Sequence, residues 1–350
     1  MERMDQDLAF MLQYENVAWY ENGKVRILDR RIYPTEIKYV ECTTYLQVAQ
    51  AITDMVTQSA GPYTAAGMGM ALAAYEVSDK KENEQLTFLE KAAYDIAHAR
   101  PTTANRMGII TNGCLEAGKQ ALLEGKSPVD AIFNRTIESL NRRYSIMEVV
   151  GGYLADMFPK NGTIMTQCFG ETIIGMMLRV SRKRNNDIKI FCAETRPYFQ
   201  GARLTSSCCA DMGFDTTVIT DNMVAYTMQH KNVDLFTSAA DTIAKDGHIA
   251  NKIGTFQMAI LAKHFGIPYF VTGIPDADKE KGSDIIIEER NPEMVLSYRG
   301  IKNTLSQVKG IYPSFDITPP ELISGIVTDK GIYSSYDLHR YFDTQVKPFY

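Results

Sequence analysis

The sequence predicts an α/β protein in which a smaller, mainly helical N-terminal domain (1–145) precedes a domain built around a parallel sheet (146–350). Two observations lead to this prediction. Before about residue 145 apolar residues recur at helical spacing, whereas from about residue 163 short apolar runs alternate with helix-like stretches. Strands that alternate with helices form βαβ units, and these build a parallel sheet with helices on its faces.

The N-terminal domain begins with short strands and turns over residues 1–40. Thr44 and Gln47 then spell a capping box, in which each side chain accepts a hydrogen bond from the other residue's backbone N–H. This pair predicts that a helix starts here. Further helices are predicted over residues 67–77, 86–100 and 127–144.

The C-terminal domain contains five apolar runs that predict strands, at residues 164–166, 188–191, 216–219, 233–236 and 267–271. A helix predicted over 255–266 ends on Gly266, as a glycine C-cap would. Polar residues, among them Cys168, Arg196 and Asp241, follow the runs closely. The carboxyl ends of parallel strands form one crevice, so we expect these side chains to converge there. The alternative is that many of them are ordinary helix N-caps.

Composition excludes several classes of protein. The 37 basic and 42 acidic residues give a net charge of −5, which argues against a nucleic-acid partner. No apolar stretch is long enough for a signal peptide or a membrane span, so a cytoplasmic protein with no membrane partner is expected. The cysteine spacing fits neither a disulfide framework nor a metal site, and the glycine patterns fit neither a dinucleotide site nor a P-loop. We therefore expect no metal and no cofactor.

Cys168 and Asp241 are the candidate chemical groups. Cys168 lies between a strand and a helix, where the helix dipole would favour the thiolate. Asp241 follows three small residues, and this apolar approach would raise the pKa of its carboxyl group toward the range useful for proton transfer. A buried filler cysteine and a helix N-cap are the structural alternatives.

Four cations could bind a phosphate group: Arg100, Arg196, Arg203 and Lys252. Arg100 precedes Pro101, which takes it off the end of its helix. Residues 251–255 are predicted to open a helix, whose free N–H groups could bind an anion. Surface salt bridges are the alternative for each cation.

Several long motifs resemble the S-methyl-5-thioribose-1-phosphate isomerase family, which is related to the ribose-1,5-bisphosphate isomerases and to the regulatory subunits of translation initiation factor 2B. The motifs are residues 194–205, 219–223, 240–241 and 250–255, with shorter ones at 28–31, 99–102, 287–292 and 313–319. The resemblance implies a Rossmann-like C-terminal domain, a homodimer, and an aldose-to-ketose isomerisation of a 5-substituted ribose 1-phosphate without a cofactor. The substrate would be S-methyl-5-thioribose 1-phosphate or 5-deoxyribose 1-phosphate.

The resemblance also implies roles for single residues. The family's catalytic cysteine and aspartate fall on Cys168 and Asp241. Its substrate contacts fall on Gln58, Ser59, Ala60, Arg100, Gln200, Asn251 and Lys252. The chain departs from the family pattern at Gln58, Phe169 and Thr242, where Arg, Asn and Arg are usual, and this predicts a divergent paralogue. A ribose-1,5-bisphosphate isomerase and a non-catalytic protein like the initiation factor 2B subunits are the alternatives.

Overall fold

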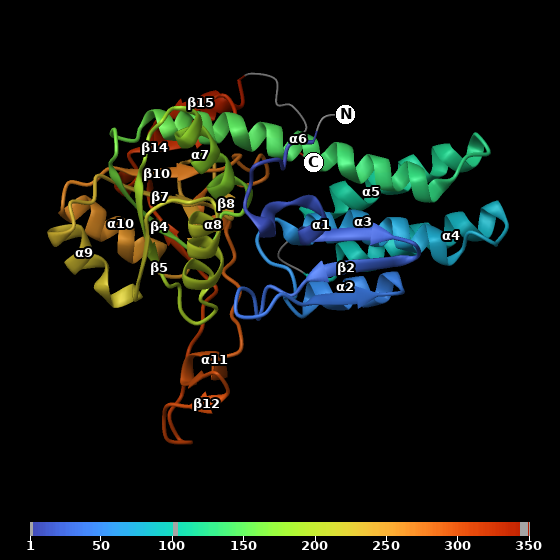
Figure 1. The fold of residues 1–350 in the computed structure, drawn as a ribbon, viewed down its shortest axis with the longest axis horizontal. Coiled ribbons are helices and arrows are strands. Elements are labelled where there is room, and N and C mark those ends of the chain that lie inside the picture. The colour runs from blue at the N-terminus through green and yellow to red at the C-terminus, as the bar shows by residue number, and fades with distance from the viewer. Residues whose placement is uncertain (1–2, 101–103, 344–348, 350) are drawn as a thin grey trace. The chain divides into compact units, whose positions relative to one another are not determined.

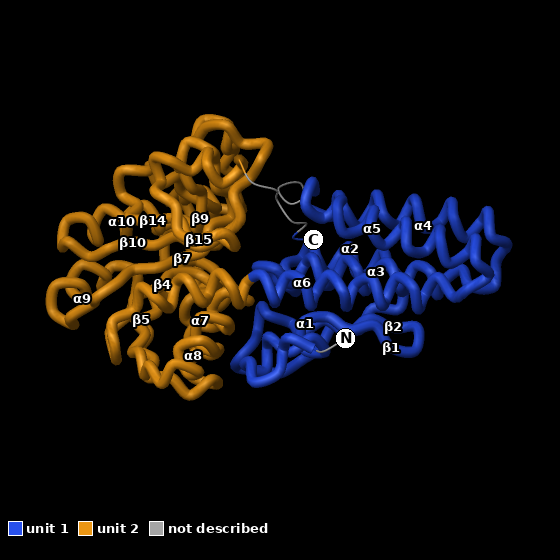
Figure 2. The backbone as a smooth tube through the Cα atoms, turned by 90° about the horizontal axis from the view of Figure 1, so that it is seen from above, with its two compact units in different colours: residues 1–146, 348–350 blue, residues 147–347 orange. Residues whose placement is uncertain are grey.

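The computed structural model describes residues 3–100, 104–343 and 349. The chain divides into two compact units, residues 1–146 with 348–350 and residues 147–347 (Figure 2). The predicted α/β class is confirmed (Figure 1).

Unit 1 combines a small antiparallel sheet with helices. The strands lie in the order β1-β2-β3, and the helices include α3, which is buried along almost its whole length. The capping box is confirmed, since Thr44 Oγ1 accepts from the N–H of Gln47 at the start of α2. The elements are α1 (Tyr14–Val17), β1 (Ala18–Glu21), β2 (Lys24–Leu28), β3 (Tyr39–Cys42), α2 (Tyr45–Thr53), α3 (Gly61–Glu76), α4 (Glu82–Ala97), α5 (Ala104–Leu123) and α6 (Pro128–Asp156), whose last residues belong to unit 2.

Unit 2 is built on a seven-stranded sheet in the order β15-β14-β10-β7-β4-β5-β6, in which only β15 runs antiparallel to its neighbour. Each of the five predicted runs forms a strand of this sheet. The strands are β4 (Thr163–Gln167), β5 (Lys189–Ala193), β6 (Thr216–Ile219), β7 (Leu235–Ala239), β10 (Tyr269–Thr272), β14 (Gly325–Thr328) and β15 (Gly331–Tyr333).

The sheet changes winding direction between β4 and β7. From β4 the chain adds β5 and β6 on one side, and then crosses to add β7, β10 and β14 on the other. This is the doubly wound Rossmann-like order, and its ligand crevice lies at the strand ends beside the switch. Helices α7 (Thr172–Lys183) and α8 (Ser206–Asp211) cover one face, and α9 (Val224–His230) and α10 (Thr255–His264) cover the other (Figure 1).

The predicted C-terminal cap of α10 is also confirmed. Gly266 adopts a φ of 69°, and the N–H of Ile267 donates to the carbonyl of Ala262 at 2.8 Å. A left-handed residue just after the last helical turn is the usual place for glycine, because it has no Cβ to clash.

A second, antiparallel sheet in the order β13-β9-β8 was not predicted. Its strands are β8 (Thr242–Ile243), β9 (Ile249–Lys252) and β13 (Phe315–Thr318). The prediction that residues 251–255 open a helix is therefore wrong for the first two residues, which end β9. β8 has only two residues, and β9 and β13 contain polar residues where the predicted strands have apolar runs.

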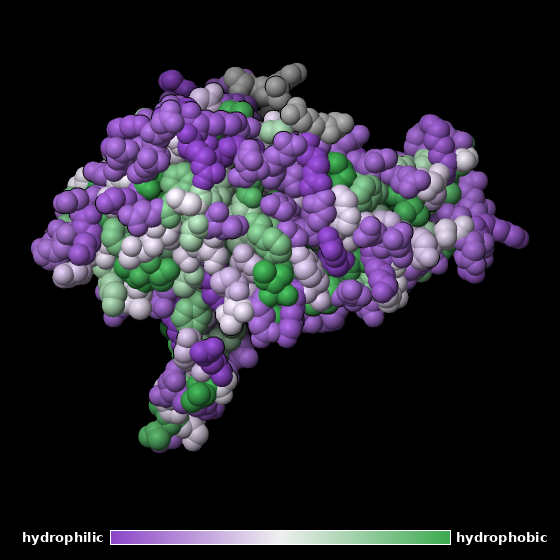
Figure 3. Space-filling view, in the orientation of Figure 1, coloured by the Kyte–Doolittle hydropathy of each residue, from purple (hydrophilic) through white to green (hydrophobic). Residues whose placement is uncertain are grey.

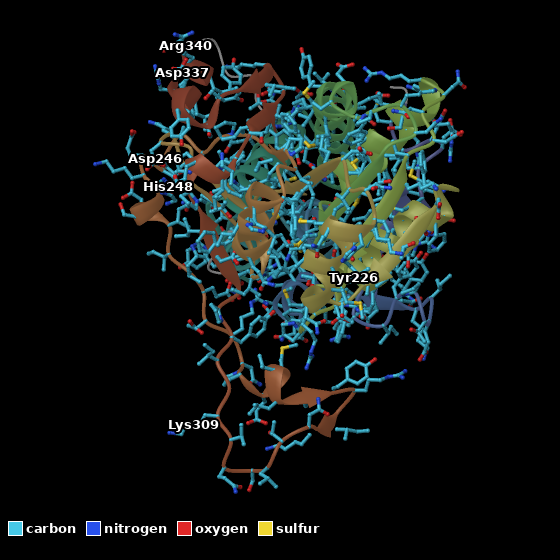
Figure 4. The ribbon with its side chains drawn as sticks, turned by 90° about the vertical axis from the view of Figure 1, so that its left-hand side faces the viewer. Tyr226, Asp246, His248, Lys309, Asp337 and Arg340 are labelled. Carbon is cyan, nitrogen blue, oxygen red and sulfur yellow. The ribbon has the colours of Figure 1, made fainter. Side chains whose placement is uncertain are left out.

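Residues 291–311 form an arm that extends away from the sheet of unit 2 and carries Lys309 (Figures 1 and 4). The arm contains α11 (Glu293–Leu296), β11 (Ser297–Tyr298) and β12 (Ile301–Lys302). It exposes apolar side chains, among them Tyr298, Ile301 and Leu305 (Figure 3). The described residues also form a π-helix, η3 (Gly201–Thr205), and short 3₁₀ helices, which are η1 (Phe10–Leu12), η4 (Asp221–Met223), η5 (Gly282–Asp284), η6 (Pro320–Leu322) and η7 (Ser335–Tyr341).

Candidate active site

Cys168 and Asp241 follow the two neighbouring strands that flank the topological switch. Cys168 comes directly after β4, and Asp241 comes two residues after the end of β7, which pairs with β4 in parallel. The two side chains are close enough for the Asp241 charge to act on the pKa of Cys168. Cys168 is half-buried and Asp241 is exposed. The expected convergence of these two residues at one edge of the sheet is therefore present within unit 2.

The backbone of Cys168 is held in a left-handed conformation, with a φ of 61°. Its N–H donates to Thr195 Oγ1 at 3.0 Å, and its carbonyl accepts from Thr205 Oγ1. Thr195, itself at a φ of 65°, is fixed by Asp221, whose carboxylate accepts from the N–H of Thr195 at 2.9 Å and of Arg196 at 2.7 Å. The ends of β4, β5 and β6 are thus linked by the side chains of Thr195 and Asp221, and these hydrogen bonds fix the backbone position of Cys168.

The thiol of Cys168 is neutral at physiological pH. Desolvation raises its pKa to about 12, opposed by the positive charge of Lys252 and reinforced by the negative charge of Asp241. The prediction of a thiolate is therefore wrong. Helix α7 begins only at Thr172, and loss of hydration at Cys168 outweighs the field of the helix end.

Asn251 and Lys252 lie buried at the end of β9. The Nζ atom of Lys252 is 4.6 Å from the ring centroid of Phe315 and 5.9 Å from that of Tyr198, so the cation is packed among aromatic faces. Since its charge also acts on Cys168, Lys252 lies near the thiol.

The helix start that was expected to bind phosphate is already capped within the chain. Asp316, on β13, accepts from the N–H of Gly254 at 2.7 Å and of Phe256 at 3.1 Å. Burial raises the pKa of this carboxyl group to about 6, against the two backbone hydrogen bonds and the charge of Lys252. The prediction of an open N-terminus at α10 is wrong because a carboxylate of the same chain occupies it.

Gln167, which was not among the predicted site residues, joins β4 to the end of β9. Its Oε1 accepts from Thr255 Oγ1 at 2.8 Å and from Asn251 Nδ2 at 3.4 Å, and its Nε2 donates to the carbonyl of Ile253 at 3.1 Å. Because Gln167 directly precedes Cys168, this buried amide sets the spacing between Cys168 and Asn251. A polar residue closing an apolar strand was the available signal.

Gln200 lies beside the end of β5. The adjoining Gly201 packs so closely on β5 that a Cβ there would come within 1.8 Å of the carbonyl oxygen of Ala193. The Gln200 side chain is buried, and its Oε1 atom has no hydrogen-bond partner among the residues that the structure describes. A buried amide oxygen without a partner is a group that a ligand can satisfy.

Two of the arginines predicted to bind phosphate donate hydrogen bonds to backbone carbonyls instead. The guanidinium of Arg196 donates to the carbonyls of Met294, Val295 and Ser297 in the arm, at 3.0 to 3.4 Å. That of Arg203 donates to the carbonyl of Tyr198 at 2.7 Å. The structure therefore gives both arginines an architectural role.

The remaining predicted contacts belong to unit 1. Gln58 is buried, and its Oε1 has no hydrogen-bond partner within the described part of the chain, whereas its carbonyl accepts from Arg30 at 2.8 Å. Ser59 is exposed and its backbone has a φ of 60°. The carbonyl of Ala60 accepts a hydrogen bond from the guanidinium of Arg143 at 3.3 Å. Arg100 is half-buried after the end of α4, and the Pro101 that follows it lies outside the described residues.

Within residues 3–100 and 104–343, no cluster of three or more His, Cys, Asp or Glu side chains is placed to hold a metal ion. In the same described stretches, no helix has both the length and the apolar character that crossing a membrane requires.

Comparison with known proteins decides the family. Residues 58–335, which include Gln58, Cys168 and Asp241, match the initiation factor 2 subunit family. The chain belongs to that family. Among curated family members, the methylthioribose-1-phosphate isomerase of Carboxydothermus hydrogenoformans is 35% identical over 341 residues, covering 91% of this chain and 95% of the relative.

Solved structures of the initiation factor 2 subunit family agree. The crystal structure of 5-methylthioribose 1-phosphate isomerase from Pyrococcus horikoshii superimposes with a TM-score of 0.81 at 30% identity, covering 96% of this chain and 99% of the other. The crystal structure of the translation initiation factor eIF-2B subunit delta from A. fulgidus superimposes with a TM-score of 0.77 at 28% identity, covering 91% of this chain and 96% of the other. The predicted resemblance is confirmed. Because the curated relatives that match nearly the whole chain are isomerases, the chain is an enzyme of the isomerase class.

Proposed function

We propose that the chain converts S-methyl-5-thioribose 1-phosphate to the corresponding ribulose 1-phosphate, a step of methionine salvage. The observation that carries this proposal is the placement of Cys168 and Asp241 just after the two strands that flank the topological switch. The names of the curated relatives support the same substrate.

The reaction needs acid/base help because the phosphate on C1 prevents the spontaneous ring opening of free sugars. The ring oxygen gains a proton as its bond to C1 breaks, a hydrogen moves from C2 to C1, and the C2 hydroxyl loses its proton to become the ketone. Asp241 handles the protons of the ring and hydroxyl oxygens. The neutral thiol of Cys168 assists the hydrogen transfer, either as a proton carrier or by keeping the site dry for a hydride shift.

Solvent deuterium distinguishes these two routes. A proton-transfer route carries solvent deuterium to C1 of the product, whereas a direct hydride shift carries none. Mass spectrometry of the product formed in D₂O measures this incorporation.

The remaining predicted residues supply the substrate contacts in this proposal. Lys252 provides positive charge near Cys168, and Asn251 and Gln200 provide amides. Gln58, Ser59, Ala60 and Arg100 are proposed contacts from unit 1. Since Gln58 is neutral where the resemblance implies arginine, one charged phosphate contact is lost, and such contacts contribute about 1.5–3 kcal/mol.

A panel of sugar phosphates tests the function. Purified protein is given the 1-phosphates of S-methyl-5-thioribose and 5-deoxyribose, and ribose 1,5-bisphosphate, and ketose formation is followed by NMR. Turnover of the methylthio compound supports the proposal, and preference for 5-deoxyribose 1-phosphate redirects it. Binding without turnover favours a regulatory protein like the initiation factor subunits. The Cys168→Ser variant is the control, and it should fold but not turn over.

A further inference from the structure

The hydroxyl group of Tyr312 is buried without a hydrogen-bond partner. Tyr312 is 2% exposed, and its Oη atom has no partner among the described residues. Buried hydroxyl groups are nearly always hydrogen-bonded, because losing water without a replacement costs free energy. This donor is therefore available to something that the folded chain does not itself contain.

Tyr312 lies in the same part of unit 2 as Cys168 and Lys252. Its ring centroid is 6.0 Å from that of Tyr198, and Tyr198 lies 5.9 Å from the Nζ atom of Lys252. Burial raises the pKa of Tyr312, and Cys168 is close enough that its ionised form would raise this pKa further. The phenol is thus a neutral donor close to both residues at physiological pH.

The backbone of Tyr312 is held at the base of the arm. Its carbonyl accepts from the N–H of Arg290 at 2.9 Å, and the N–H of Ser314 donates to the carbonyl of Glu288 at 2.8 Å. These pairings hold the position of the ring before any ligand binds. A preorganised donor loses little freedom when it forms a hydrogen bond to a ligand.

We infer that Tyr312 is a substrate-binding residue whose hydroxyl group donates a hydrogen bond to an oxygen of the ribose moiety bound beside Cys168. This inference rests on the proposed function. A ribose oxygen fits better than the phosphate group, because Lys252 already offers the phosphate a charged partner and the phenol is neutral.

The Tyr312→Phe variant tests this role, because it removes only the hydroxyl group. We expect kcat/KM for S-methyl-5-thioribose 1-phosphate to fall about tenfold or more, the effect of leaving one substrate oxygen unpaired. The inhibition constant of inorganic phosphate should stay at its wild-type value. The melting temperature should not fall, because the hydroxyl has no partner to lose.

Tyr341→Phe is the matched control. Tyr341 is equally buried, but its Oη donates to Asp329 at 2.9 Å and it lies outside the proposed site. Its variant should melt at a lower temperature with kcat/KM unchanged. If Tyr312→Phe keeps the wild-type kcat/KM, the inference is overturned. It is also overturned if the Tyr312→Phe variant unfolds, because the hydroxyl group would then have a structural partner. Weaker inhibition by phosphate in that variant assigns the bond to the phosphate and also overturns it. If the wild-type protein turns over no compound of the panel, the proposed function fails instead.

Discussion

A thiol with a pKa of about 12 carries almost no thiolate at neutral pH. Cys168 therefore enters the reaction with its proton in place, so that as a proton carrier it would donate this proton before it accepts another. This state is consistent with the proposed division of labour, in which the carboxylate of Asp241 is the base.

The neutral state of Cys168 can be measured by alkylation. At pH 7.5 the thiolate fraction of Cys168 should be on the order of 10³-fold smaller than that of a free cysteine, whose pKa is about 8.5. Cys168 should therefore react with iodoacetamide about a hundredfold or more slower than a free cysteine. Its rate should rise about tenfold per pH unit up to pH 9.5 without levelling off, because the thiolate fraction keeps increasing below the pKa. Peptide mass spectrometry gives the site-specific rate, with Cys168→Ser as the blank. A plateau below pH 8 contradicts the raised pKa.

Asp241 should be essential for turnover but not for folding. The Asp241→Asn variant keeps the shape of the side chain and loses the base, which should lower kcat by a factor of about 10²–10⁴. Its melting temperature should stay near the wild-type value because the side chain is exposed. The exposed Asp278, which forms an ion pair with Lys279, provides the control Asp278→Asn with unchanged kcat. Equal rates for both variants would remove Asp241 from the mechanism.

At the scale of elements, Asp316 joins the small sheet to the start of α10. Its folded-state pKa of about 6 lies above its ordinary value of 3.8, so the folded protein takes up a proton that the unfolded chain releases. Between about pH 4 and 6 the folded state is protonated and the unfolded state is not. The contribution of Asp316 to stability therefore increases as the pH falls through 6.

Unfolding experiments check this sign. The free energy of unfolding of the wild-type protein, relative to Asp316→Asn, should rise by on the order of 3 kcal/mol between pH 7 and pH 4. Urea denaturation at several pH values measures the difference, with Asp278→Asn as the exposed control. A difference that is independent of pH, or that falls as the pH falls, contradicts the assigned pKa.

Five strands of the large sheet could be predicted because each has an apolar run bounded by polar residues, whereas its last two strands, β14 and β15, were not predicted. The strands β8, β9 and β13 could not be predicted, since β8 has two residues, β9 and β13 contain polar residues, and the pairing joins Asn251 to Asp316, residues far apart in the sequence. The error at Cys168 comes from burial of the thiol, and the error at the start of α10 comes from capping by Asp316. Burial and capping by a distant carboxylate are absent from any local pattern.

At the scale of the whole molecule, the predicted site residues come from both compact units. The sequence motifs identified the family and placed Cys168 and Asp241 at neighbouring strand ends. They did not reveal Gln167 or Tyr312, because a buried cross-link and an unpartnered hydroxyl are properties of packing. The predicted domain boundary at residue 145, the substrate contacts and the cytoplasmic location stay predictions.

The oligomeric state is a further prediction at this scale. The resemblance implies a homodimer, so light scattering after size-exclusion chromatography should give about twice the mass of one chain. The value should not change over a tenfold dilution in the micromolar range if the dimer is stable. A mass of one chain throughout that range contradicts the prediction.

The left-handed backbone at Cys168 implies a trade-off between stability and activity. A non-glycine residue in this conformation costs about 1–3 kcal/mol, a cost that glycine does not bear. Glycine at this position would relieve the strain but would remove the thiol that the proposed reaction uses.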